Sequence, residues 1–167
     1  RFTRELARLL KDPNYGESKV FHYCSSEKAD KMVNGAFLMG CFCIIILKMS
    51  PEEAHAKFVN YSPYFKHYRD ASKGDCAYQC TLLQCLQGLD WAIKMKWYSF
   101  KDFNVKEYEY MERVENGDLN WIIPNKFMAF MGPIEKKDAN QRFGHHPSKH
   151  IPIFHKVGVD KVIRLND

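Results

Sequence analysis

The segment His22-Tyr23-Cys24 places a thiol where an α/β protein can bind a phosphate group. Residues 19–24 favour a short strand, and a polar loop and an apolar helical pattern follow them. Backbone N–H groups in such a loop, and at the start of the next helix, can bind an anion. A thiolate that hydrolyses phosphate esters there also needs an arginine six positions later to clamp the phosphate. That position holds Asp30, which would repel phosphate, so we expect a degenerate, non-catalytic loop.

A second candidate is the acidic segment 107–118, which reverses locally the net charge of +5. Glu109, Glu112 and Glu115 are spaced by three, which predicts that they lie near one side of a helix. The following Asn116-Gly117 predicts a sharp turn, because both residues tolerate positive φ, and we interpret it as a hinge. A solvated helix face is the more common meaning of such a run. The alternative is a pocket for a basic partner, since ligands favour crevices between folded units.

Histidines form a third candidate group, because their spacing permits a metal site. No cysteine or carboxylate pattern completes such a site, so we expect exposed loop and helix histidines and no metal. The four are His145, His146, His150 and His155.

The six cysteines include no Cys-x-x-Cys pair, and most lie within apolar helical patterns. We therefore expect buried free thiols in a reducing, intracellular compartment. The six are Cys24, Cys41, Cys43, Cys76, Cys80 and Cys85.

Charge and hydropathy exclude two classes of partner. The sequence pI is about 8.8, but the lysines are scattered and no nucleic-acid-binding motif accompanies them, so we expect no nucleic-acid partner. The longest apolar run, residues 36–47, is shorter than the roughly 20 residues that a membrane span needs. We expect no membrane association and interpret this run as part of a buried helix.

The elements that must position these residues follow from hydrophobic periodicity. Asn104 can cap the helix that carries the acidic segment, and Ser50-Pro51-Glu52-Glu53 has the composition of a helix start. We predict helices near residues 2–10, 31–48, 75–96, 104–114 and 147–156, and strands at 19–24, 126–131 and 159–165.

This order of elements predicts an α/β fold in which helices flank a central sheet. We divide the chain into a first domain (1–103), an acidic linker and hinge (104–124) and the start of a second domain (125–167). The last segment is too short for a core of its own, and we expect it to be poorly ordered in isolation. The chain begins at Arg1 and stops directly after an apolar run, so we also expect both ends to be cut.

Several runs bring the chain close to a known family. Residues 107–124, EYEYMERVENGDLNWIIP, resemble the linker of the cell-division-cycle-fourteen dual-specificity phosphatases, and residues 127–133 continue the match. Further similar runs are residues 34–41, 50–54 and 68–71, which look like that family's first domain, and 162–166, which look like the first core strands of its second.

The resemblance implies two tandem domains of the dual-specificity-phosphatase fold. In that family the first domain lacks a catalytic loop and helps to shape the substrate groove. The second domain carries a His-Cys-x-x-Gly-x-x-Arg loop and an aspartate general acid. The chain would then hold the later part of the first domain, the linker and the opening of the second, with no catalytic residue of its own.

The resemblance also implies a substrate class. The family removes phosphate from phosphoserine or phosphothreonine before proline, with a basic residue a little further on, and from phosphotyrosine. It does so through a cysteinyl-phosphate without a metal or cofactor. Its substrates are largely sites of cyclin-dependent kinases, which implies a role in the cell cycle and mitotic exit, in nucleus and cytoplasm. The residues that match its pocket for the basic residue are Glu109, Glu112 and Asp118.

Two functions remain open at this point. The first is the substrate-recognition part of a cysteine-dependent protein phosphatase. The alternative is a non-catalytic phosphatase-like binding module that holds basic phosphoproteins. Coding sequence downstream of Asp167 that contains a Cys-x-x-Gly-x-x-Arg loop would favour the first.

Overall fold

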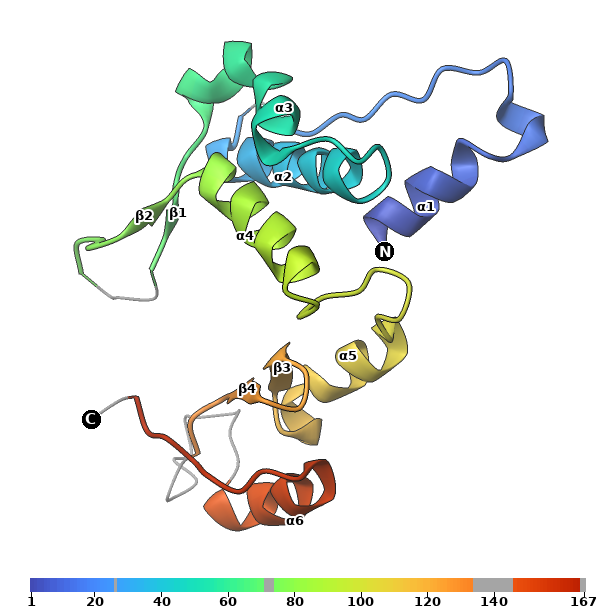
Figure 1. Cartoon of the computed structure of the whole chain (residues 1–167). Coiled ribbons are helices and arrows are strands. Elements are labelled where there is room, and N and C mark those ends of the chain that lie inside the picture. Colours follow the sequence, from blue (N-terminus) through green and yellow to red (C-terminus); the bar gives the residue numbers. More distant parts are fainter. Residues whose placement is uncertain (26, 71–73, 134–145, 166–167) are drawn as a thin grey trace. The chain divides into compact units, whose positions relative to one another are not determined.

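The computed structural model describes residues 1–25, 27–70, 74–133 and 146–165. The chain divides into two compact units, Arg1–Phe100 and Lys101–Asp167, whose elements are drawn in Figure 1. Each unit is described by itself. The finer division at residues 103 and 124 stays a prediction.

The first unit is mainly helical. Two short 3-10 helices, Pro13–Tyr15 and Val59–Tyr64, lie between its longer elements. Its only paired strands within the described residues are β1 (Tyr68–Arg69) and β2 (Gln79–Cys80), which run antiparallel. Its α-helices are α1 (Phe2–Leu9), α2 (Ala29–Ile45), α3 (Pro51–Ala56) and α4 (Leu82–Lys94).

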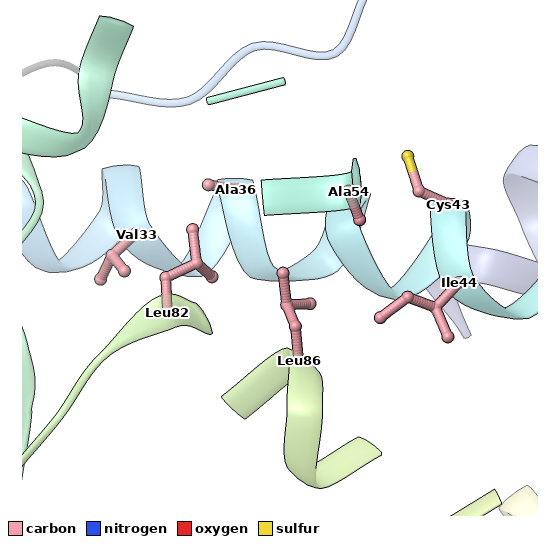
Figure 2. Packing of buried hydrophobic residues seen from close by; sticks show 7 residues of the cluster. All are labelled: Val33, Ala36, Cys43, Ile44, Ala54, Leu82 and Leu86. Atoms are coloured by element: carbon pink, nitrogen blue, oxygen red, sulfur yellow. The ribbon is translucent and has the colours of Figure 1, made fainter. Parts of the chain in front are cut away.

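Helix α2 is the centre of this unit, as its apolar sequence predicts, and α3 and α4 pack against it. Figure 2 shows Leu82 and Leu86 pointing from α4 toward α2. Gly40 permits the close approach, since a Cβ there would lie 2.7 Å from Leu86 Cδ2. The buried cluster comprises Val33, Ala36, Cys43, Ile44, Ala54, Leu82 and Leu86.

Two capping boxes fix where helices begin. Ser50 Oγ accepts from Glu53 N–H at 3.2 Å, and the Glu53 carboxylate accepts from Ser50 N–H at 2.8 Å, which confirms the predicted helix start. Thr81 and Gln84 make the same reciprocal pair at the start of α4. The prediction of a helix from residue 75 was therefore wrong, because strand β2 and the Thr81 cap precede α4.

The expected central sheet is absent from the described residues, where each sheet has only two strands. Residues 19–24 form no strand, and neither do residues 159–165. A strand is stable only when its backbone groups pair with a neighbour, and neither run has a strand beside it. The α/β composition is retained, but the arrangement is helices with small antiparallel pairs.

The second unit begins with α5 (Val105–Met111), capped as predicted by Asn104, whose Oδ1 accepts from Glu107 N–H at 3.2 Å. A 3-10 helix, Val114–Asn116, follows. Strands β3 (Leu119–Ile123) and β4 (Phe127–Phe130) then form an antiparallel hairpin that pairs Leu119 with Phe130. The predicted strand 126–131 is β4, whereas β3 lies in the stretch 104–124 that was predicted to be the linker and hinge.

Helix α6 (Pro147–Val157) completes the second unit close to its predicted bounds. His150 is 2% exposed, and its ring lies 5.6 Å from Phe154 and 5.3 Å from Phe130. Leu119 of β3 is fully buried in this unit. The small core therefore combines residues from both sides of residue 124. Among the described residues, no helix has both the length and the apolar character needed to cross a bilayer.

Candidate functional site

The loop after Cys24 borders an open pocket of about 590 Å³ at the start of α2. Asp30 lies in the first turn of α2, six positions after Cys24, so no guanidinium can clamp a phosphate from that position. Charges of both signs line the pocket instead. Its lining is His22, Cys24, Ser25, Glu27, Lys28, Lys31, Asn34, Gly35 and Leu38.

Gly35 is what allows this loop to lie against α2. A Cβ at Gly35 would lie 3.1 Å from Cys24 Sγ and 3.3 Å from His22 Nε2, tighter than ordinary contacts. The Cys24 thiol is exposed. Sequence reasoning identified His22 and Cys24 but missed Lys28 and Lys31, whose spacing of three at a helix start was the available signal.

The acidic segment is less regular than its spacing predicted. Glu109 lies in α5 and is half-buried, whereas Glu112 is exposed and is the C-cap residue directly after this helix. Glu115 belongs to the 3-10 helix that follows. The expectation of three glutamates along one side of a single helix was therefore wrong beyond Glu112, because α5 stops at Met111.

The chain folds back after α5 through a compact turn. The Asn116 side-chain amide donates to Tyr110 O at 2.7 Å, which satisfies a carbonyl at the end of α5. The N–H of Asp118 donates to Arg113 O at 3.0 Å, and its carbonyl accepts from Met131 N–H at 3.1 Å. These bonds hold half-buried Asp118 between the end of α5 and the hairpin.

Positive φ angles occur one residue later in this turn than the sequence suggested. They lie at Gly117 (111°) and Asp118 (49°), not at Asn116. The predicted sharp turn is present, and α5, which precedes the turn, packs against β3, which follows it. Of the three predicted binding residues, Glu109 and Glu112 lie one turn apart, and the turn brings Asp118 back toward the end of their helix.

The histidines do not converge on one site. The side chain of His146 caps α6, His150 is buried among aromatic rings, and His155 is exposed in the last turn of α6. His145 lies outside the described residues. Among the residues that the structure does describe, no three histidine, cysteine or acidic side chains are grouped to hold a metal ion.

The cysteines are all free, but only Cys43 is buried. Cys24 is exposed and the other four are half-buried, so the expectation of buried thiols was wrong for most of them. The sequence pattern placed Cys76 and Cys80 inside a helix, whereas both precede α4.

Comparison with known proteins identifies the relatives of this chain. Residues 1–92 match the family model described as dual specificity protein phosphatase, N-terminal half. The chain is 41% identical to human dual specificity protein phosphatase CDC14A and 40% identical to the mouse protein, over 99% of its own length in both cases. It is 35% identical to tyrosine-protein phosphatase cdc-14 of Caenorhabditis elegans.

The matched part of these relatives is limited. The chain spans 28% of the length of the two CDC14A proteins and 24% of the nematode protein. The family model covers more than half of the chain and includes all of α1 to α3 and most of α4. The chain belongs to the dual specificity protein phosphatase family and carries that family's N-terminal half.

Proposed function

We propose that this chain is the substrate-recognition part of a cysteine-dependent protein phosphatase. The reaction would be removal of phosphate from phosphoserine-proline, phosphothreonine-proline and phosphotyrosine sites. Two observations support the proposal: the similarity to proteins named dual specificity phosphatases over 99% of the chain, and a loop after Cys24 that has Asp30 in the clamp position. The nucleophile and general acid would then lie outside this chain.

The observation that carries the recognition role is the turn that returns Asp118 to the end of α5. Glu109 and Asp118 are half-buried and Glu112 is exposed, so all three residues are at least partly accessible to a ligand. A lysine or arginine of a substrate placed there would meet more than one carboxylate. We assign the binding of a basic substrate residue to Glu109, Glu112 and Asp118.

The size of the selectivity follows from ordinary ion-pair energies. Partly exposed pairs contribute roughly 0.2–1 kcal/mol each, and a bidentate arginine contact contributes about 1.5–3 kcal/mol. Because 1.4 kcal/mol is tenfold, the site would favour a basic residue by roughly ten- to a few-hundred-fold. The partners proposed on this basis are phosphoproteins with a basic residue after phosphoserine-proline, such as cyclin-dependent-kinase substrates. We propose the nucleus and cytoplasm as their location.

The test uses the longer enzyme that carries this chain, with Glu109→Lys and Glu112→Lys combined. Catalytic efficiency is measured on matched phosphoserine-proline peptides that differ only in having lysine or alanine at one position after the proline. The double reversal should abolish the lysine preference while hydrolysis of a small uncharged aryl phosphate hardly changes. A lysine preference that survives would show that the segment is only a solvated helix surface.

Two further variants separate charge from structure. Glu17→Lys with Glu115→Lys alters the net charge equally at exposed positions outside the proposed site, and should preserve the preference. Asp118→Asn removes one charge but keeps a residue type that tolerates positive φ, so it should reduce the preference without unfolding the turn.

The chain alone should show no phosphatase activity. Purified 167-residue protein is incubated with an aryl phosphate, beside a Cys24→Ser variant. Turnover that Cys24→Ser abolishes would refute the assignment of a degenerate loop. If the longer protein is equally inactive but binds basic phosphopeptides, the alternative of a non-catalytic binding module replaces the enzyme.

A further inference from the structure

Two thiols of the first unit lie in direct contact. Cys80 Sγ and Cys85 Sγ are 3.4 Å apart, although five positions separate the residues. The pair lies where β2 ends and α4 begins.

The fold, rather than sequence spacing, brings the pair together. Cys80 ends β2, Thr81 caps α4, and Cys85 N–H donates to Thr81 O at 3.1 Å in the first turn of that helix. Leu82 and Leu86, on either side of Cys85, are 4% and 0% exposed. The buried leucines pack α4 against α2, and Cys85 of this helix contacts Cys80 at the end of β2.

The Cys80–Cys85 pair does not have the arrangement of a metal site. A structural zinc ion needs four ligands in tetrahedral geometry, and three of them at least must converge. Within the described part of the chain, no group of three or more histidine, cysteine or acidic side chains converges in this way. Two thiols in contact, half-buried and so within reach of a small oxidant, instead fit a dithiol.

We propose that Cys80 and Cys85 form a peroxide-sensitive dithiol that closes reversibly to a disulfide. The oxidant is a hydroperoxide such as hydrogen peroxide. Closure would tie the end of β2 to the first turn of α4. This site lies within the first unit and does not depend on the phosphatase assignment.

The chemistry takes two balanced steps. The Cys80 thiolate attacks one oxygen of hydrogen peroxide, an S–O bond forms, the O–O bond breaks, and the leaving hydroxide takes a proton to become water. The Cys85 sulfur then attacks the Cys80 sulfenic acid, an S–S bond forms, the S–O bond breaks, and the Cys85 proton leaves with the hydroxide as a second water. Two thiols are oxidised by two electrons, and one peroxide is reduced to two waters.

The environment favours this order of attack. Burial, and then the contact with Cys80, raise the pKa of Cys85 to about 12. A thiol that is held protonated is a poor initial nucleophile, which suits Cys85 to the resolving role.

Other cysteines provide matched comparisons. Cys24 is exposed and lies at the pocket of α2, and Cys76 Sγ donates to Tyr78 O at 2.8 Å. The sulfur atom that contacts Cys80 is that of Cys85, not that of Cys24 or Cys76. Oxidation driven by exposure alone would reach Cys24 first.

The test is peptide mapping of the full chain after graded hydrogen peroxide and alkylation of the remaining thiols. Residues 74–94 form one tryptic peptide that contains Cys76, Cys80 and Cys85. We expect this peptide to lose the mass of two hydrogens while Cys76 stays alkylated, and a dithiol reductant should reverse the change. Fragment ions should locate the bond between Cys80 and Cys85.

Variants then assign the roles. Cys85→Ser should leave a Cys80 sulfenic acid that a dimedone probe traps, Cys80→Ser should leave Cys85 unlabelled, and Cys76→Ser should not alter the disulfide. A link through Cys41 or Cys76, irreversible oxidation of Cys80 without a link, or oxidation of Cys24 while the pair stays reduced would each overturn the proposal. The mapping of the unsubstituted chain decides the question even if a variant fails to fold.

Discussion

Gly40 and Leu86 should be energetically coupled, because one occupies the space that the other leaves. A Cβ on Gly40 would lie 2.7 Å from Leu86 Cδ2, 3.0 Å from Cδ1 and 3.5 Å from Cγ. Leu86→Ala removes these three atoms. The consequence of Gly40→Ala should therefore change sign between the two backgrounds, which a double-mutant cycle measures directly.

The magnitudes follow from helix propensity and packing. Alanine is about 1 kcal/mol better than glycine inside a helix, and overpacking a core costs roughly 1–3 kcal/mol. Gly40→Ala alone should thus destabilise by up to about 2 kcal/mol. Leu86 is fully buried, so Leu86→Ala should cost about 3–5 kcal/mol. In that background Gly40→Ala should restore about 1 kcal/mol, which gives a coupling of about 1–3 kcal/mol.

The assay is urea dependence of hydrogen exchange in α2, which reports on the first unit without assuming that both units unfold together. Gly88→Ala in α4 is the matched control, because nothing lies within 4 Å of a Cβ at that position. It should stabilise by roughly 0.5–1 kcal/mol, both with and without Leu86. If Gly40→Ala has the same effect with and without Leu86, the close packing of α2 on α4 is wrong.

Three further predictions concern caps and turns. Ser50→Ala should cost about 1 kcal/mol in thermal unfolding. Because the Ser50 backbone N–H lowers the pKa of Glu53, the stability from this box is complete above the ordinary carboxyl pKa and is lost as pH falls through the lowered pKa. Glu53→Gln removes the titrating carboxyl, so an acid limb of the stability profile that is unchanged in this variant would refute the box. Gly117→Ala should cost roughly 1–3 kcal/mol in the second unit, since the φ of Gly117 is 111° and a Cβ there would lie 2.9 Å from Leu119 Cδ1. Amide hydrogen exchange in β3 at the same rate as in the unsubstituted chain would contradict this prediction. Asn104→Ala should cost about 1 kcal/mol and reduce helical circular dichroism through α5, and undiminished helicity would exclude the cap.

Local signals in the sequence predicted the helices well. The apolar run of α2, the Ser50-Pro51-Glu52-Glu53 start of α3, the Asn104 cap and the bounds of α6 all depend on residues close in sequence. Capping and periodicity act within one or two turns, so the residues that determine them are visible without any tertiary knowledge.

Strand pairing was where prediction failed, because pairing depends on partners that lie elsewhere in the chain. Residues 19–24 have strand-forming side chains but no neighbour, whereas β3 was missed because Pro124 and the polar Asn120 obscured its alternation. The contact between Cys80 and Cys85 was invisible for a related reason: both were assigned to one helix, in which positions five apart face away from each other.

Asp118 shows why residue types alone could not settle the candidate site. Its φ of 49° belongs to a region that aspartate, asparagine and glycine enter most readily, so the fold has a reason for this residue that is independent of charge. Glu109 and Glu112 have no such backbone reason, since both adopt ordinary helical conformations that several other residue types accommodate equally well. The proposed binding carboxylate and a turn former therefore coincide at one position. The proposed binding of a basic substrate residue therefore depends most on the charges of Glu109 and Glu112. Asp118 supports the proposal only if Asp118→Asn, which keeps the same backbone tolerance, reduces the lysine preference.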